Sequence, residues 1–262
     1  MVMQASEIQY TDYSSWEPKD YLTEYYAEVM PDARFTLEFV VESLQKMPPL
    51  SVALDFGCGP IVPYILPLVP KVQEIHMAEY LSSNRAELQK WLLDRDDAHN
   101  WREFTLETLR LEGNSAPTEG EVNTREQQAR ACVTRVLPGD VTESDPLGSA
   151  MRKFYPLVTA HYCAEAVGTS KQKWRVYMQN IMSLVKPGGV LIVSACGAGS
   201  YYRVGDRYFP STKLHIQDVL ACLCDNNFID IDLRIRHIPD NSEQGFSNVI
   251  FARAFKPEVG TT

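Results

Sequence analysis

Residues 50–60 read Leu50-Ser-Val-Ala-Leu-Asp-Phe-Gly-Cys-Gly-Pro60, and this stretch decides the fold. Its first half is a short, mostly apolar run, which is typical of a strand buried on both faces. The run breaks into Gly57-Cys58-Gly59-Pro60, where glycine permits positive φ and lets the backbone approach a ligand closely. Parallel α/β sheets bind ligands at the carboxyl ends of their strands, so this loop is a candidate binding loop. A purely structural turn stays open as the alternative.

Helical and strand patterns alternate on both sides of this stretch. An apolar stripe predicts an amphipathic helix over 35–47, ended by Pro48-Pro49. Helical segments are also predicted at 61–69, 83–93, 124–132, 171–184 and 216–226, with a tight turn at 186–189. Further strands are predicted at 74–79, 133–138, 155–160, 190–195, 229–235 and 249–255. This alternation predicts one α/β domain over 1–262, with a doubly wound, Rossmann-like, mostly parallel sheet and residues 1–49 as an N-terminal helical cap.

Composition narrows the class of protein. The 262 residues include 25 Lys and Arg against 34 Asp and Glu, so the formal net charge is −9, which disfavours nucleic-acid binding. No apolar stretch approaches the roughly 18 residues of a membrane-spanning helix, and residues 1–13 lack the pattern of a signal peptide. Six scattered cysteines fit reduced thiols in a cytoplasmic protein. The spacing of Cys222-Leu-Cys224 does not match a metal site.

Two acidic residues lie at the ends of later strands. Glu79 comes 20 residues after Gly59 and ends the next predicted strand, where a carboxylate can accept hydrogen bonds from both ribose hydroxyls. Asp140, followed by Val141, ends a third strand and suits a donor on a purine edge. A dinucleotide fingerprint requires glycine at position 62, which is Val62. The set therefore predicts a nucleoside-containing cofactor without a pyrophosphate. Taken singly, Glu79 also fits a surface carboxylate and Asp140 a turn residue.

These residues resemble the motifs of S-adenosylmethionine-dependent methyltransferases of the doubly wound class I fold. The resemblance is closest to the nicotinamide, phenylethanolamine and indolethylamine (thioether) N-methyltransferase family, and it runs from about residue 17 to 255. It rests on Asp20-Tyr-Leu-Thr-Glu-Tyr-Tyr26, residues 74–80 and 84–91, Leu111-Glu-Gly-Asn114, Asp140-Val-Thr-Glu-Ser-Asp-Pro-Leu-Gly148, Leu184-Val-Lys-Pro-Gly-Gly189 and Ser200-Tyr-Tyr202. It implies methyl transfer from S-adenosyl-L-methionine to a small-molecule acceptor, with S-adenosyl-L-homocysteine as the product of the cofactor.

The resemblance also implies which residues bind the cofactor. They are Tyr21 and Tyr26 at the methionine carboxylate, Gly57 and Gly59 along its path, Glu79 at the ribose with Tyr80 and Asn84 beside it, Asp140 and Val141 at the adenine, and His161 at a strand end. Tyrosine faces attract a sulfonium cation by about 0.5–2 kcal/mol each, which supports an aromatic lid. Without the resemblance, a half-buried aromatic cluster is the simpler interpretation of Tyr21 to Tyr26.

On the acceptor side the resemblance implies Tyr25, Tyr162, Glu165 and Tyr202, with Glu165 and Tyr21 as catalytic residues. Glu165 is the one acidic residue in His161-Tyr-Cys-Ala-Glu-Ala-Val167. An ammonium must lose a proton before it can attack, and a carboxylate can take that proton directly or through water. A solvated carboxylate at a strand–helix junction is the alternative for Glu165. His161 titrates near neutrality, so a general base is the alternative to a cofactor contact or a structural role.

The sequence departs from the family pattern on the acceptor side. Ala195 stands where the nicotinamide branch has an aspartate, the segment 196–199 contains no acidic residue, and the loop 240–247 does not align securely. We therefore expect no second carboxylate there, which weakens nicotinamide and catecholamine as substrates. The tyrosines at 25, 162 and 202 suit a flat or aromatic acceptor.

The favoured interpretation is an N-methyltransferase acting on a small amine or aromatic nitrogen by in-line displacement. Transfer to oxygen, sulfur or carbon stays open, as does a non-catalytic relative that only binds the cofactor. No Asn-Pro-Pro-Tyr or Asp-Pro-Pro-Tyr segment follows residues 155–160, which weakens methylation of nucleic-acid bases. We expect a cytoplasmic monomer with a small-molecule acceptor and no nucleic-acid, membrane or metal partner.

Overall fold

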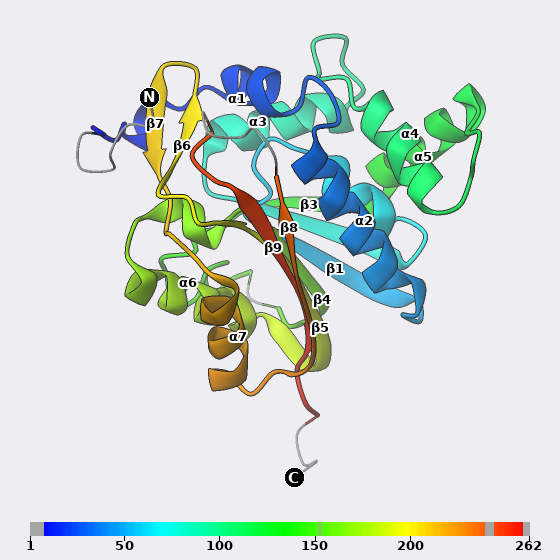
Figure 1. The fold of residues 1–262 in the computed structure, drawn as a ribbon. Helices are drawn as coiled ribbons and strands as arrows, with labels where there is room; N and C mark the ends of the chain where they lie inside the picture. Colours follow the sequence, from blue (N-terminus) through cyan, green and yellow to red (C-terminus); the bar gives the residue numbers. More distant parts are fainter. Residues whose placement is uncertain (1–7, 152, 239–243, 259–262) are drawn as a thin grey trace.

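A computed structural model describes residues 8–151, 153–238 and 244–258, and a seven-stranded sheet forms its centre (Figure 1). In spatial order the strands are β3 (Val133–Pro138), β2 (Val72–Glu79), β1 (Leu50–Phe56), β4 (Tyr155–His161), β5 (Val185–Gly197), β9 (Asn248–Phe255) and β8 (Ile229–His237). The first five run parallel, and β9 runs antiparallel to both β5 and β8. The predicted α/β class and doubly wound, mostly parallel sheet are confirmed.

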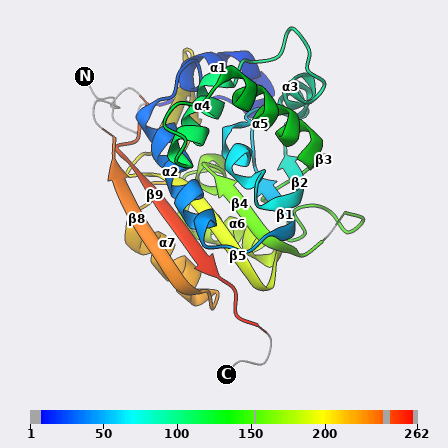
Figure 2. The same ribbon diagram turned by 90° about the vertical axis from the view of Figure 1, so that its right-hand side faces the viewer.

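Helices cover both faces of this sheet (Figure 2). One layer contains α2 (Pro31–Gln45), α3 (Ser82–Leu92), α4 (Arg102–Leu111), α5 (Glu119–Cys132) and the 3-10 helix η3 (Pro63–Leu68). The other contains α6 (Lys171–Ser183) and α7 (Ile216–Asp225). Each layer has its own apolar core against the sheet, which is why the central strands read as nearly continuous apolar runs.

The strand order places the binding site. β1 lies between β2 and β4, so the chain crosses to one side of β1 and then to the other. Helices that follow these strands diverge at that point and leave a crevice at the carboxyl ends of β1 and β4. The loops that begin at Gly57 and Tyr162 therefore open into the same space.

Several elements differ from the sequence-based predictions. The helix predicted over 35–47 begins earlier, at Pro31, because proline is well suited to the first turn of a helix. The predicted helix over 61–69 is the 3-10 helix η3, since Pro63 and Pro67 lack the N–H groups that an α-helix requires. The turn predicted at 186–189 is an irregularity inside β5, with a register shift against β4 and φ of +71° at Gly188.

Two further elements had no counterpart in the sequence-based predictions. Helix α4 escaped detection because half of its buried positions are the polar residues Thr105 and Thr108. The short antiparallel hairpin of β6 (Tyr201–Val204) and β7 (Arg207–Pro210) stands apart from the central sheet. Within the described residues no helix has both the length and the apolar character needed to cross a membrane.

Asp55 is a buried acid in the middle of the sheet. It lies on β1, and the hydroxyl of Thr159 on β4 donates a hydrogen bond of 2.7 Å to its Oδ1. Burial raises the pKa of Asp55 to about 7, and the hydrogen bond from Thr159 opposes that shift. In the unfolded chain the same acid ionises near pH 4, so the folded state holds an extra proton between about pH 4 and 7.

Asp55→Asn should therefore make stability less dependent on pH. Above pH 4 the ionisation of Asp55 in the unfolded chain lowers the free energy of unfolding of the natural protein, by about 4 kcal/mol at most by pH 8. The asparagine cannot ionise and still accepts the hydrogen bond from Thr159. Urea unfolding should show a higher free energy of unfolding for the variant than for the natural protein at pH 8 but not at pH 4.5. Equal changes at both pH values would contradict this account of Asp55.

Candidate active site

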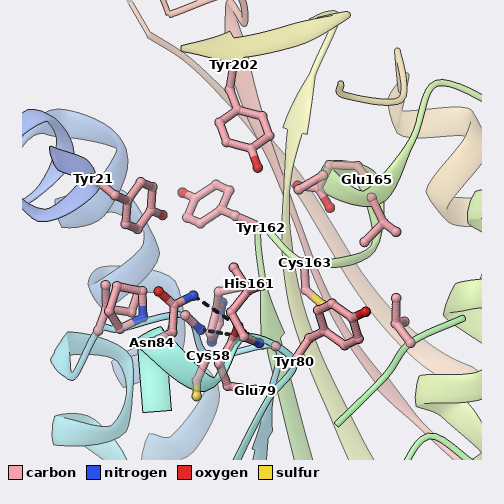
Figure 3. A pocket seen from close by; sticks show the side chains of 18 of the residues that line it. Tyr21, Cys58, Glu79, Tyr80, Asn84, His161, Tyr162, Cys163, Glu165 and Tyr202 are labelled. Carbon is pink, nitrogen blue, oxygen red and sulfur yellow. Dashed lines mark hydrogen bonds between the residues drawn. The ribbon is translucent and has the colours of Figure 1, made fainter. Parts of the chain in front are cut away.

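A cavity of about 360 Å³ lies at the carboxyl ends of the parallel strands. Figure 3 shows Glu79, Asn84, Cys58 and Tyr80 around one part of it and Tyr21, Tyr162, Tyr202 and Glu165 around another. All residues assigned to a site from the sequence line this one cavity: Tyr21, Tyr25, Tyr26, Gly57, Gly59, Glu79, Tyr80, Asn84, Asp140, Val141, His161, Tyr162, Glu165 and Tyr202. They come from six separate stretches of chain, so the fold alone brings them together.

The glycine loop after β1 is fixed against the neighbouring strand. The backbone N–H groups of Gly57 and Cys58 donate to the carbonyl oxygen of Ala78, at 2.8 and 3.2 Å. Gly57 and Gly59 have φ of +68° and +60°, a conformation that side-chain-bearing residues rarely adopt. A Cβ on Gly57 would come within 2.1 Å of Cys163 Sγ, whereas a Cβ on Gly59 would meet no atom within 4 Å. Gly57 thus permits close packing, and Gly59 leaves the cavity open.

Glu79 is the centre of a hydrogen-bond network at one end of the cavity. Its Oε1 accepts from Leu81 N at 2.8 Å and Asn84 Nδ2 at 3.0 Å, and its Oε2 accepts from Gly59 N at 3.0 Å (Figure 3). Trp16 Nε1 donates to Asn84 Oδ1 at 2.8 Å and so extends the network to the N-terminal segment. Burial raises the pKa of Glu79, while the three donors oppose that shift.

Asp140 and Val141 form another part of this end. The Oδ1 of Asp140 accepts from the backbone N–H and the hydroxyl of Thr142, at 2.9 and 2.7 Å, which makes a tight local turn. Asn180 Nδ2 donates to the carbonyl oxygen of Val141 at 2.9 Å. Asp140 is therefore both a turn residue and a residue of the cavity wall. Tyr80 lies at the rim, 62% exposed.

His161 is buried at the end of β4. Its Nδ1 is hydrogen-bonded to the hydroxyl of Ser194 at 2.9 Å, and its Nε2 has no hydrogen-bond partner among the described residues. Burial lowers the pKa of His161 to about 3, so the imidazole is neutral near pH 7. Such a weak base is a poor acceptor for the proton of an ammonium, which argues against His161 as the general base.

Glu165 occupies the opposite end of the cavity, on the 3-10 helix η4 (Ala164–Val167). Its side chain is 3% exposed, and its Oε1 accepts a hydrogen bond of 2.8 Å from the backbone N–H of Cys196. Burial raises the pKa of Glu165 to about 7. A carboxyl group with this pKa can exchange a proton near neutral pH.

The N-terminal segment and the β6–β7 hairpin lie side by side (Figure 1), and both supply residues to the cavity wall; residues 10–26 and 201–210 are here called the roof. The hydroxyl of Tyr25 on α1 (Pro18–Tyr25) donates to Arg203 O at 2.8 Å, and the hydroxyls of Tyr13 and Tyr202 are 2.8 Å apart. Glu24 forms an ion pair of 2.9 Å with Arg203. Trp16, Val204 and Phe209 make a small apolar core within the roof.

Three free thiols also line the cavity: Cys58, Cys163 and Cys196. Burial is the main reason that the pKa of each thiol lies well above its ordinary value, and nearby carboxyl groups raise it further. All three are therefore protonated near neutral pH. Within the described residues no group of three or more His, Cys, Asp or Glu side chains is arranged to hold a metal ion.

The cavity contains residues that the sequence analysis missed. Trp16, Cys196 and Asp32 line it, and Asp32 adds a fourth acidic side chain to the three that the sequence analysis assigned to a site. The helix prediction began at Phe35 and left Asp32 outside it. Pro31 followed by an acidic residue was a readable signal for the first turn of a helix. Residues 240–243 of the unaligned loop lie outside the described part of the chain.

The fold is shared with solved methyltransferases. The N-methyltransferase NodS from Bradyrhizobium japonicum, in complex with S-adenosyl-L-homocysteine, matches with a TM-score of 0.52 at 11% identity, over 90% of this chain and 91% of that one. The DhpI-SAM-HEP complex matches with a TM-score of 0.56 at 12% identity, over 90% and 93%. These matches show that the chain has the Rossmann-like fold of class I methyltransferases.

Sequence comparison identifies the family. Residues 4–252 match the NNMT/PNMT/TEMT family, and the chain belongs to it. Human nicotinamide N-methyltransferase is 29% identical over 218 residues, covering 80% of this chain and 81% of the relative. Indolethylamine N-methyltransferase of Mus musculus is 32% identical over 227 residues, covering 79% and 84%. Human phenylethanolamine N-methyltransferase is 30% identical over 200 residues, covering 75% and 69%.

The chain is thus an S-adenosylmethionine-dependent small-molecule N-methyltransferase. The predicted family, reaction class and methyl donor are confirmed by these comparisons.

The two glycines should respond differently to alanine. Gly57→Ala adds a Cβ that collides with Cys163 Sγ at an unfavourable φ, so we expect a loss of stability of about 2 kcal/mol or more. Gly59→Ala adds strain alone, about 1 kcal/mol, and its methyl group points into open cavity. Thermal unfolding and calorimetric titration with S-adenosyl-L-homocysteine separate the two effects. Gly57→Ala should mainly lower the melting temperature, whereas Gly59→Ala should mainly weaken binding; the reverse pattern would contradict the assignment.

Proposed function

We propose that the cavity binds S-adenosylmethionine at its Glu79 end and an amine-bearing, flat or aromatic small molecule at its Glu165 end. The observation that carries this proposal is the pair of buried carboxyl groups at the two ends of one cavity. Glu79 receives three N–H donors, whereas Glu165 receives one from another residue and has a pKa of about 7. Glu79 therefore suits binding, and Glu165 suits proton transfer.

The residues at the first end fit the cofactor. Glu79 would hold the ribose with Tyr80 and Asn84 beside it, and Asp140 and Val141 would contact the adenine. Gly59 leaves open space beside Glu79, which supports close approach of a ligand to the backbone. The buried, unpartnered Nε2 of His161 in the cavity wall supports a contact with a polar ligand atom. Tyr21 and Tyr26 would hold the methionine end, with Gly57 and Gly59 along its path.

When bound, the cofactor supplies an electrophilic methyl group on a sulfonium centre, which in-line displacement transfers to nitrogen with release of S-adenosyl-L-homocysteine. Glu165 pairs with the acceptor's ammonium and removes its proton, directly or through one water, so that a lone pair is free to attack. The faces of Tyr25, Tyr162 and Tyr202 orient a flat acceptor, and Tyr21 lies between the two ends. Orientation of this kind supplies on the order of 7–11 kcal/mol in enzymes.

The roof supports the idea that residues 1–49 act as a cap within a single catalytic domain over 1–262. The cavity of one chain contains both carboxyl groups that the proposal uses, and we propose a monomer as the active form. A net charge of −9 and the absence of Lys and Arg from the described cavity wall favour a small cationic acceptor over nucleic acid. We propose a cytoplasmic location, which the six free cysteines favour.

Neutral isosteres distinguish the two carboxyl groups. Glu79→Gln removes a charged acceptor of hydrogen bonds, so we expect binding of S-adenosyl-L-homocysteine to weaken about 10- to 100-fold. Glu165→Gln should leave that affinity within about twofold and slow methyl transfer about 100-fold or more. Calorimetry and mass spectrometry of the methylated amine measure the two effects on the same samples. Equal loss of cofactor affinity in both variants would remove the acceptor-side role of Glu165.

The pH dependence of catalysis should reveal Glu165 directly. Burial raises its pKa to about 7, so the carboxyl group is neutral below that pH and able to accept a proton above it. The nearby Tyr13, Cys163 and Cys196 do not interfere, because their own pKa values are raised. We expect kcat/KM for the acceptor to rise with pH, with the midpoint of the rise at or below about pH 7.

Glu165→Gln provides the control for this profile. The acceptor titrates identically with both proteins, so the difference between their profiles isolates Glu165. If kcat/KM of the variant rises at the same pH and by the same factor, another group is responsible for the pH dependence.

A further inference from the structure

The charges of the cavity wall are unusually one-sided. Four carboxyl groups line it, those of Asp32, Glu79, Asp140 and Glu165, and no Lys or Arg does so among the described residues. His161, the one histidine in the wall, is neutral near pH 7. Glu79 and Asp140 lie at the end that fits the cofactor, and this leaves Asp32 and Glu165 for the acceptor.

Asp32 is held at the first turn of α2, where the helix dipole favours a negative charge. It is half-buried, and burial raises its pKa although the N–H groups of Asp32 and Ala33 oppose the shift. The hydroxyl of Tyr162 donates a hydrogen bond of 3.4 Å to the backbone carbonyl oxygen of Asp32, so the first turn of α2 lies beside a residue of the cavity wall. Burial is the main reason that the pKa values of Tyr21, Tyr162 and Cys196 are raised, and the charge of Asp32 raises them further. Helix α2 continues into the apolar core, which fixes this position.

Asp32 and Glu165 approach the acceptor end from different elements. Cys196 lies at the end of β5, and its backbone N–H donates a hydrogen bond to Glu165 Oε1. Burial raises the pKa of the Cys196 thiol, and the charges of Glu165 and Asp32 raise it further. Neither carboxylate has a basic partner in the part of the chain that the structure describes. The side chain of Glu165 is only 3% exposed, and of its two carboxyl oxygens only Oε1 receives a hydrogen bond from another described residue. An unpaired carboxylate is costly to bury, and a bound cation removes that cost.

We infer that the acceptor carries two basic nitrogen atoms on a flat, apolar body, with Asp32 binding the ammonium that is not methylated and Glu165 facing the nitrogen that is. This inference rests on the proposed function and names its substrate class. Tyr25, Tyr162 and Tyr202 contact the apolar body, while the two carboxylates recognise its two ends. An acceptor with one amine leaves the half-buried carboxylate of Asp32 without a counter-charge, so it binds less well.

The test compares two amines that differ by one group. Benzylamine and 1,4-bis(aminomethyl)benzene share a ring and a reacting aminomethyl group, and the second has an additional ammonium. Binding of each to the full chain saturated with S-adenosyl-L-homocysteine is measured by calorimetry, and methyl transfer by mass spectrometry. We expect the diamine to bind about tenfold more tightly or better, and to be methylated with a correspondingly higher kcat/KM.

Two variants complete the design. Asp32→Asn keeps the size of the side chain and removes its charge, so the preference for the diamine should fall to about twofold or less. Glu28→Gln removes one negative charge from an exposed residue outside the cavity wall and should keep the full preference. Melting temperatures confirm that both variants fold.

The outcomes separate the inference from the proposal beneath it. Equal binding of both amines to the natural protein would overturn the inference, as would an undiminished preference in Asp32→Asn. Binding of S-adenosyl-L-homocysteine without binding of either amine would also overturn it while leaving the cofactor site standing. No binding of S-adenosyl-L-homocysteine to the natural protein would instead overturn the proposed function.

Discussion

The carboxylate of Glu79 holds the site together. It accepts hydrogen bonds from the glycine loop after β1, from the backbone that follows β2 and from Asn84 on α3, and Asn84 in turn binds Trp16 of the N-terminal segment. Hydrogen bonds to an ionised acceptor are about twice as strong as neutral ones, especially when buried. One side chain therefore fixes the relative positions of four pieces of chain, and this end of the cavity takes its shape from them.

The two ends of the cavity use the same kind of group in different ways. At Glu79, burial raises the pKa, and hydrogen bonds from Leu81, Asn84 and Gly59 oppose that shift. At Glu165, burial meets a single donor from another residue, and the pKa moves to about 7. The number of N–H groups that face each carboxylate thus gives the two groups different electrostatic surroundings, and the proposed difference in their roles rests on this. The backbone supplies most of these donors, so the fold itself sets the difference.

The sequence was most informative about the cavity residues that come directly after a buried parallel strand. Glu79, Asp140 and the glycine loop could be located because a buried parallel strand has a readable apolar run and the ligand side lies just after it. Asp32 could not, because its helix was taken to begin at Phe35 and nothing local shows that the first turn of α2 reaches the cavity. Helix α4 was missed because two of its four buried residues are threonines. The β6–β7 hairpin was missed because its strands are short and their buried positions do not alternate regularly. Long-range packing decides such elements.

The free thiols of Cys58, Cys163 and Cys196 surround a site that must hold a strong alkylating agent. Sulfur is a better nucleophile than an amine, but only as the thiolate. Burial and the surrounding carboxylates keep these thiols protonated. Burial in the cavity wall, reinforced by the nearby carboxyl groups, therefore keeps the enzyme's own cysteines in the form that reacts poorly with a methyl donor.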